Sequence, residues 1–219
     1  MDAVTKPMVF DQIARVGKAL ASGKRLELLD LLAQAERTVE GLARAAGLGV
    51  TTTSAHLQTL KQGGLVATRK EGTRVFYQLA SSEVAALYAA VRDVATTHLA
   101  DVTAAVTAFL GPEVERVTRA ELLARADRGE VTVLDVRPKV EYAAGHIPGA
   151  LNIPLDELPD RLDELPEGTE IVAYCRGAQC VLAPDAVRLL ADQGRPASRL
   201  ADGMLEWRLA ELPVEGGAR

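Results

Sequence analysis

The hydrophobic pattern of the chain changes at Gly111-Pro112, and this change restricts the fold more than any other feature. Before it, apolar residues recur at helical spacing in five segments, at residues 10–20, 24–35, 39–46, 51–62 and 81–110. After it, mostly apolar runs at residues 131–136 and 170–174 alternate with helix-like segments. A Gly-Pro pair ends a helix and is typical of a linker. The sequence therefore predicts two domains, residues 1–110 and 111–219.

The first domain has the pattern of a winged helix-turn-helix, which is a mainly α-helical fold. The helical segments 39–46 and 51–62 are separated by a Gly-Leu-Gly turn. Two short β-like runs follow at residues 65–68 and 75–79, joined by a Glu-Gly turn that is typical of a hairpin. Two short helices and a hairpin, in this order, indicate that the second helix reads DNA and that the hairpin is the wing.

Polar and basic side chains cluster where such a domain would meet DNA. The candidate DNA contacts are Thr51, Thr52, Thr53, Ser54, His56, Gln58 and Lys61 on the recognition helix, and Arg69, Lys70 and Arg74 on the wing. Hydroxyl, imidazole and amide groups can reach base edges, and basic groups can bind phosphates. The alternative is that a Thr/Ser-rich helix start only caps the helix and continues as a solvated face.

The net charge of −5 conceals an uneven distribution that is compatible with DNA binding. Residues 1–110 carry 12 basic and 10 acidic residues, whereas residues 111–219 carry 13 basic and 20 acidic residues. Phosphate binding depends on where the positive charge lies rather than on its total. We therefore expect the first domain, and not the second, to bind double-stranded DNA.

The segment VEGLARAAGLGVTTTSAHLQTLKQGGLVATRKEGTRVFYQL resembles the ArsR-type repressors, with their S-x-H-L pattern at Ser54 to Leu57. The resemblance covers about residues 8–105 and implies a homodimer on a palindromic operator, paired through its first and last helices. Many members of that family sense metals, but this half has no cysteine, and Asp93, His98 and Asp101 do not match the usual ligand spacing. We therefore expect no metal site and no cofactor here.

The second domain has the alternation of strands and helices that is typical of an α/β fold with a parallel sheet. Helix-like segments lie at residues 120–128, 155–162 and 184–193. The strand at residues 170–174 runs directly into Cys175, and Cys180 precedes the next helix. A loop between a strand end and a helix start turns amide N–H groups inward, which would lower the pKa of Cys175 and favour its thiolate.

The loop residues between the two cysteines have compatible chemistry. Arg176 offers a fixed positive charge for a sulfur oxyanion or a persulfide. Gly177 and Ala178 are small enough for a tightly closed loop, and Gln179 completes it. The alternative is a buried structural cysteine at a strand end with an incidental second cysteine.

Three segments of this half resemble single-domain rhodaneses: LDVRPKVEYAAGHIPGALNIPL, YCRGAQC and ADGMLEWRLAELPV. The resemblance covers about residues 114–216 and implies a rhodanese-like parallel sheet flanked by helices. It implies that Cys175 accepts a sulfane sulfur and becomes a persulfide, and that Asp135, Arg137 and Glu141 support the fold. A six-residue loop is the size found in sulfur-transferring members, whereas related arsenate reductases and phosphatases have a longer one.

The loop departs from the rhodanese pattern at its last position, where an arginine is frequent and this chain has Cys180. Cys180 could attack a persulfide on Cys175, releasing sulfide and leaving a disulfide. The alternative is that Cys180 packs as a small apolar residue.

These features together predict a DNA-binding repressor whose second domain senses reactive sulfur at Cys175 and Cys180. A persulfide, a polysulfide or thiosulfate is the expected sulfur donor. The first alternative is a working sulfurtransferase, with Cys175 as nucleophile, whose DNA-binding half controls its own production. The second is a thiol sensor of arsenite or another soft metal. The sequence has no signal-peptide pattern and no long apolar stretch, so we expect a cytoplasmic protein without a membrane partner.

Overall fold

The computed structural model describes residues 4–216. The chain divides into two compact units, Met1–Tyr88 and Ala89–Arg219. This division falls inside a helix, 22 residues before the position at which the hydrophobic pattern places a linker. The outermost residues of the two expected domains, 1–3 and 217–219, lie outside the described residues. Within residues 4–216, no helix has the length and apolarity needed to cross a membrane.

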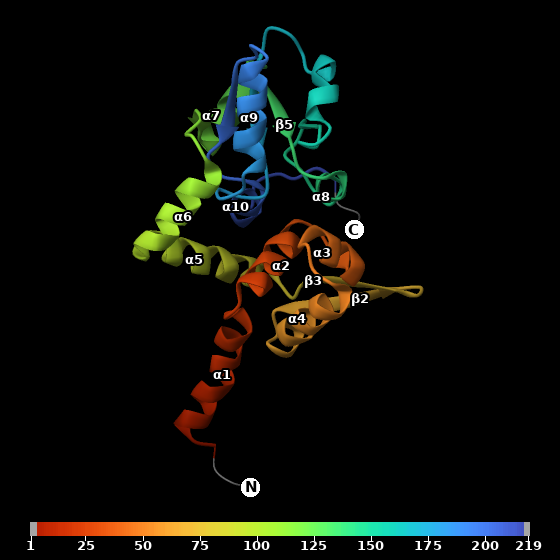
Figure 1. Ribbon diagram of the computed structural model, residues 1–219, viewed down its shortest axis with the longest axis vertical. Coiled ribbons are helices and arrows are strands. Elements are labelled where there is room, and N and C mark those ends of the chain that lie inside the picture. Colours follow the sequence, from red (N-terminus) through yellow and green to blue (C-terminus); the bar gives the residue numbers. More distant parts are fainter. Residues whose placement is uncertain (1–3, 217–219) are drawn as a thin grey trace. The chain divides into compact units, whose positions relative to one another are not determined.

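The first unit is a winged helix-turn-helix (Figure 1). Its elements are α1 (Lys6–Leu20), α2 (Gly23–Gln34), β1 (Arg37–Thr38), α3 (Val39–Ala45), α4 (Val50–Gln62), β2 (Val66–Glu71), β3 (Arg74–Leu79) and the start of α5 (Ser82–His98). The helix-turn-helix is α3 and α4, and the wing is the β2–β3 hairpin, as predicted. Its core contains leucines of α2, α3 and α4 together with Tyr77 of β3.

Local chemistry explains the main features of this unit. The Thr38 side chain caps α3 by accepting a hydrogen bond from the amide of Gly41 at 3.3 Å. The wing turns at Gly72, whose φ of +59° is readily adopted only by glycine. The two-residue strand β1, which was not expected, pairs antiparallel with β3 and makes a three-stranded sheet.

The segment 81–110 forms two helices instead of the one that its periodicity predicts. Helix α5 ends at His98, and α6 (Ala100–Leu110) begins after Leu99, whose backbone is extended. The hydroxyl of Thr103 donates to the Thr96 carbonyl at 2.5 Å and so satisfies a group left without a helical partner. Hydroxyl side chains that bond to the backbone compete with helix continuation, which apolar periodicity does not reveal.

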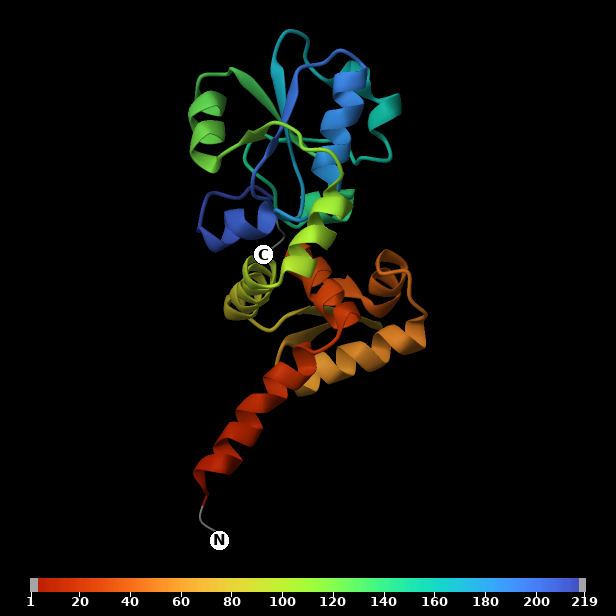
Figure 2. The ribbon, with the colours of Figure 1, turned by 60° about the vertical axis from the view of Figure 1, so that its left-hand side comes forward.

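The second unit contains a parallel sheet with the strand order β4-β8-β7-β5-β6 (Figure 2). Its further elements are β4 (Arg116–Val117), α7 (Arg119–Asp127), β5 (Val131–Asp135), α8 (Lys139–Ala143), β6 (Leu151–Asn152), β7 (Glu170–Tyr174), α9 (Leu182–Asp192), β8 (Ala197–Leu200) and α10 (Met204–Leu209). Helices α7 and α9 lie on opposite faces of the sheet. The predicted α/β fold with flanking helices is confirmed.

Alternation along β7 divides the core of this unit into two layers. Val172 and Tyr174 face the layer that includes α7 and α10. Ile171 and Ala173 face the α9 layer, and Cys175 continues their side of the strand. The position of Cys175 in the α9 layer therefore follows from strand periodicity.

The predicted helix at residues 155–162 is wrong. The chain forms two short 3₁₀ turns there, η1 (Leu158–Asp160) and η2 (Leu162–Glu164). Pro159 lies inside the expected helix, and proline lacks the amide hydrogen that an interior helical position requires. Leu158 is nevertheless fully buried, so the leucines that suggested a helix still contribute to the α9 layer.

Candidate functional site

Most of the predicted reading residues of α4 face solvent. Thr51, Thr52 and Gln58 are exposed, while Ser54 and His56 are half-buried. Lys61 is also exposed, and its ammonium donates to the Thr68 hydroxyl at 3.1 Å. These side chains form an accessible polar surface on the expected recognition helix.

Thr53 was wrongly included among the DNA contacts. Its side chain is fully buried, and its hydroxyl donates to the Gly49 carbonyl at 3.0 Å. It lies four and seven residues before Leu57 and Leu60, so helical spacing places all three on the core side of α4. The prediction grouped Thr53 with its exposed neighbours because they all carry hydroxyl side chains.

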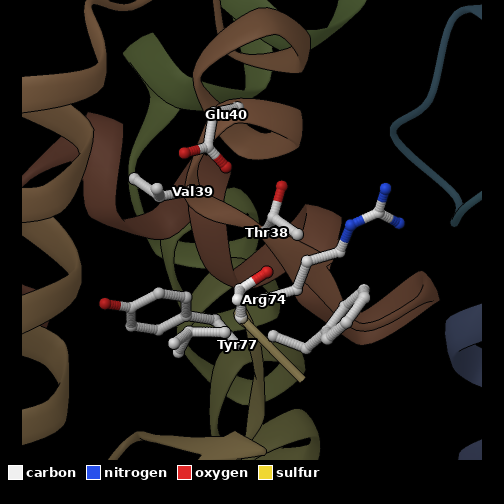
Figure 3. Close-up of a pocket in the computed structure, with 8 residues that line it drawn as sticks. Thr38, Val39, Glu40, Arg74 and Tyr77 are labelled. Atoms are coloured by element: carbon white, nitrogen blue, oxygen red, sulfur yellow. The ribbon is translucent and has the colours of Figure 1, made fainter. Parts of the chain in front are cut away.

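The wing cations differ in how far their charge is already balanced. Arg69 pairs with Glu36, and it pairs with Glu71 at 2.6 Å. Hydrogen bonds to Glu36 and then Glu71 raise the pKa of Arg69. Its charge is therefore largely neutralised within the unit, and Lys70 and Arg74 are the better candidates for phosphate contacts. The cavity beside the wing is lined by Thr38, Glu40 and Arg74, among others (Figure 3).

The cysteine loop is held at its start by the N-terminal end of α10. The Cys175 carbonyl accepts a hydrogen bond from the Met204 amide, and the Arg176 carbonyl accepts one from the Leu205 amide, both at 2.9 Å. Gly203 permits this approach, since a Cβ atom there would lie 2.3 Å from the Gly177 nitrogen. The loop is closed by a hydrogen bond from the Cys180 amide to the Gly177 carbonyl at 3.0 Å.

Cys175, which the sequence predicts to be a thiolate, lies buried beside Cys180. Its side chain is 1% exposed in the α9 layer, and its sulfur lies 3.5 Å from the Cys180 carbonyl oxygen. Burial, reinforced by its hydrogen bond with Cys180, raises the pKa of Cys175 well above its ordinary value. The geometry therefore favours a neutral thiol at this position.

Cys180 has the properties that were expected of Cys175. It is less buried, and its pKa is lowered, chiefly by a hydrogen bond from Cys175. Backbone amides of Leu182 and Arg176 lower that pKa further. The converging amides predicted from the strand–loop–helix order are present at both sulfurs, and at Cys175 those of Ala183 and Gly177 oppose the larger effect of burial.

Arg176, predicted to offer a fixed positive charge for a sulfur anion, lowers the pKa of Cys180 through its charge and also has a carboxylate partner within the unit. Its guanidinium pairs with both oxygens of the fully buried Glu141 carboxylate, at 2.7 to 3.1 Å. The bidentate pair connects the loop to α8. Glu141 thus has a structural partner in the loop, and much of the charge of Arg176 is balanced.

Side chains of α5 that lie in the second unit contact the loop region, which the sequence did not suggest. The Gln179 amide nitrogen donates to the Thr96 hydroxyl at 2.6 Å. Arg92 pairs with Glu206 of α10 at 2.6 Å, and both side chains are mostly buried. Helical periodicity marked α5 as apolar and gave no sign of these polar contacts.

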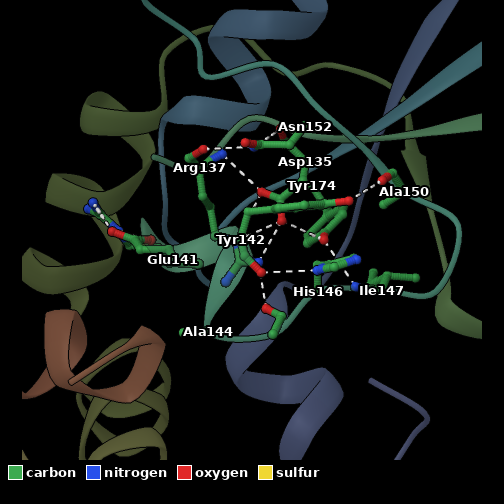
Figure 4. Close-up of polar contacts among 12 residues, drawn as sticks. Asp135, Arg137, Glu141, Tyr142, Ala144, His146, Ile147, Ala150, Asn152 and Tyr174 are labelled. Carbon is green, nitrogen blue, oxygen red and sulfur yellow. Dashed lines mark hydrogen bonds and ion pairs between the residues drawn. The ribbon is translucent and has the colours of Figure 1, made fainter. Parts of the chain in front are cut away.

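A buried polar network supports the end of β5, which lies beside β7 in the sheet (Figure 4). Asp135 and Arg137 form a fully buried ion pair at 2.5 Å. The Tyr174 hydroxyl donates to Asp135 at 2.6 Å and accepts from the Ile147 amide at 3.1 Å. His146 stacks on the ring of Tyr142 and bonds to its carbonyl oxygen. The network fixes the residue that immediately precedes Cys175.

Fold and site together define a class of protein, namely a winged helix-turn-helix regulator with a rhodanese-like domain. Residues 22–68 match the bacterial regulatory protein family arsR, and residues 118–210 match the rhodanese-like domain. The chain belongs to the ArsR family of transcriptional regulators and carries a rhodanese-like domain.

Known proteins resemble the whole chain and each half. The HTH-type transcriptional regulator Rv0324 of Mycobacterium tuberculosis is 61% identical over 213 residues, which span 97% of this chain and 94% of that protein. A sulfurtransferase of Allochromatium vinosum is 33% identical over 89 residues, or 41% of this chain and 82% of that protein. A solved homodimeric winged helix-turn-helix fragment of Mb0332 from Mycobacterium bovis is 53% identical, covering 46% of this chain and 95% of the fragment, with a TM-score of 0.42.

Proposed function

We propose that this regulator is a homodimeric repressor that detects reactive sulfur through Cys175 and Cys180 and changes its affinity for DNA in response. The observation that carries the proposal is the thiol pair itself. Two cysteines share one six-residue loop, and one of them has a lowered pKa while the other is a buried thiol. A nucleophile and a resolving thiol within reach of each other are the requirements of a reversible redox switch.

The order of the chemistry that we propose follows the pKa directions of the two thiols. The Cys180 thiolate attacks the outer sulfur of a persulfide RSSH, so that a Cys180 persulfide forms and the thiolate RS⁻ leaves. Cys175 then loses its proton and attacks the inner sulfur of that persulfide, forming the Cys175–Cys180 disulfide and releasing HS⁻. The two thiols lose two electrons, and the donor is reduced to a thiol and sulfide. This order reverses the one implied by the rhodanese resemblance.

The contacts of Gln179 supply a route from the loop to the helix that enters the winged helix unit. Helix α5 starts at Ser82, in the first unit, and ends at His98, in the second. Closing a disulfide across the loop changes the backbone around Gln179, whose amide bonds to Thr96 on that helix. A difference of about 1.4 kcal/mol in DNA-binding free energy between the two states changes affinity tenfold.

The test compares the reduced and polysulfide-treated full chain on a DNA fragment selected from random sequences by the reduced protein. We expect at least a tenfold change in Kd, with a Cys175–Cys180 disulfide in the peptide mass spectrum and Cys180 as the first residue alkylated by iodoacetamide. The Cys180→Ala variant should bind DNA without a response. Unchanged affinity after confirmed oxidation would remove the sensing role, and first alkylation at Cys175 would reverse the proposed order.

A separate variant tests whether the contact between Gln179 and Thr96 on α5 couples the loop to DNA binding. Thr96→Val removes the hydroxyl that accepts from Gln179 but leaves both cysteines in place. The variant should be oxidised at the parent rate and show a smaller change in DNA affinity. A full response in Thr96→Val would mean that the loop acts on DNA binding by another route.

A second candidate function is catalytic sulfur transfer, which the similarity to the Allochromatium vinosum sulfurtransferase favours. In that case the protein would transfer sulfur from thiosulfate or a persulfide to cyanide or a thiol over many turnovers. Rapid turnover that is lost in the cysteine variants, together with DNA binding that is indifferent to sulfur, would support this function over sensing.

A further inference from the structure

Arg199 is a buried cation whose side chain reaches the cysteine loop, although no motif of the sequence pointed to it. It lies on β8, and only 7% of the residue is exposed. Its guanidinium donates a hydrogen bond to the Ala178 carbonyl oxygen in the loop, at 3.5 Å. The side chain therefore ends beside the segment that joins the two cysteines.

Sheet geometry explains why Arg199 and Cys175 share one side of the sheet. Arg199 is the register partner of Ala173 on the parallel strand β7. Residues two apart on a strand face the same side, so Cys175 continues the side of Ala173. Ala197 precedes Arg199 by two residues and packs in the α9 layer with Ala173 and Cys175.

The charge of Arg199 is poorly balanced by the residues around it. Within residues 4–216, no carboxylate oxygen lies within 4.0 Å of its guanidinium. The nearby charges on other elements are Arg116, which repels it, and Glu113, which attracts it from beyond ion-pair distance. A buried charge without a counter-ion is costly, so a negative partner is expected.

Only the two thiols can provide that partner inside the loop. Burial lowers the pKa of Arg199, and negative charge on Cys175 and on Cys180 counteracts this effect. Arg92 pairs with Glu206, and Arg176 pairs with Glu141 while its charge also lowers the pKa of Cys180, so Arg199 is the cation near the loop that has no carboxylate partner among the described residues. A thiolate or persulfide is thus the natural counter-ion of Arg199.

We propose that Arg199 stabilises the sulfur anion of the loop, the Cys180 thiolate before reaction and the persulfide afterwards. It supplies from β8 the positive charge that rhodanese loops often carry at their last position, where this chain has Cys180. The inference rests on the proposed function for the identity of the reacting thiols, and it concerns their ionisation rather than DNA binding. Arg199 acts as an electrostatic positioning residue.

The test measures how fast iodoacetamide alkylates each cysteine of the reduced full chain between pH 5.5 and 10. Arg199→Met keeps an unbranched apolar stem and removes the charge. Loss of a nearby buried cation should shift the alkylation midpoint of Cys180 upward by about one pH unit, which is a tenfold slower reaction below the midpoint. Arg199→Lys keeps a charge and should remain closer to the parent.

The matched control is Arg128→Gln, which removes a half-exposed arginine already paired with Glu130 and should leave the midpoint unchanged. An Arg199→Met profile that overlays the parent would overturn the proposal, as would an equal shift in Arg128→Gln. Arg199→Met should fold if the proposal is right, because the substitution leaves no buried carboxylate without its partner. Failure of the variant to fold would therefore also overturn the proposal. Arg199→Met could shift the alkylation midpoint of Cys180 while polysulfide leaves the DNA affinity of the parent unchanged. That result would refute only the sensing function.

Discussion

At the residue scale, the environment of each charged group matters more than its type. Asp135 and Arg137 are both fully buried and satisfy each other, and burial raises the pKa of the adjoining Tyr174 so that its hydroxyl remains a donor. Arg128 and Glu130 make a pair of similar length on the surface. The two pairs have the same chemistry, but removing one partner leaves an uncompensated charge only in the buried case.

This contrast predicts the effect of two matched substitutions. Arg137→Gln should lower the free energy of unfolding by about 3–5 kcal/mol, because it leaves the Asp135 carboxylate buried without its cation. Arg128→Gln should leave the unfolding free energy close to the parent value, since water replaces the lost partner. Urea unfolding of both variants measures the difference. Equal stability of the two would mean that the Asp135 network does not support the fold.

At the element scale, α10 and the cysteine loop approach each other so closely that only glycine fits between them. Gly203→Ala should destabilise the second unit by about 1–3 kcal/mol, because the added Cβ would lie 2.3 Å from the Gly177 backbone nitrogen. The same clash should displace the loop and alter alkylation of its cysteines. Thermal unfolding and alkylation rates measure the two effects.

The control for that prediction is Gly23→Ala, at the start of α2, where an added Cβ meets nothing within 4 Å. This variant should keep the parent stability or exceed it slightly, since alanine favours a helix. If Gly203→Ala behaved in the same way, the contact between α10 and the loop would not be tight.

At the scale of the whole molecule, α1 carries exposed apolar side chains that would suit the interface of the proposed homodimer. Met8, Phe10 and Ile13 are 49%, 59% and 61% exposed, which is unusual for such side chains gathered on one helix. Within the proposed homodimer, a second copy of the chain covers this surface. Two linked DNA-binding units also gain affinity through their effective concentration.

The Ile13→Asp substitution tests this arrangement, because it places a charge in the proposed interface. We expect the variant to elute as a monomer in size-exclusion chromatography with light scattering, and to bind the selected DNA fragment about 100-fold more weakly. Asp11→Asn, on the same helix, should remain dimeric. A dimeric Ile13→Asp protein would assign the α1 surface to another partner.

Local sequence alone determined the elements with strong periodicity and clear punctuation. The helix-turn-helix, the wing at Gly72 and the strand that runs into Cys175 all follow from residue spacing and turn chemistry. The six-residue loop with its two cysteines, and the amides that converge on it, were also predictable, because a strand followed by a helix leaves amide groups at the junction.

Tertiary structure alone decided how deeply each thiol is buried and which cations lie beside the loop. Thr53 and Cys175 are buried by helical and strand packing that composition does not reveal, and for Cys175 this burial raises the pKa of its thiol. Arg199 meets the loop because β8 lies beside β7, a pairing between segments more than twenty residues apart. Ionisation depends on desolvation and on neighbouring charges in space, and neither quantity is encoded in the local order of residues.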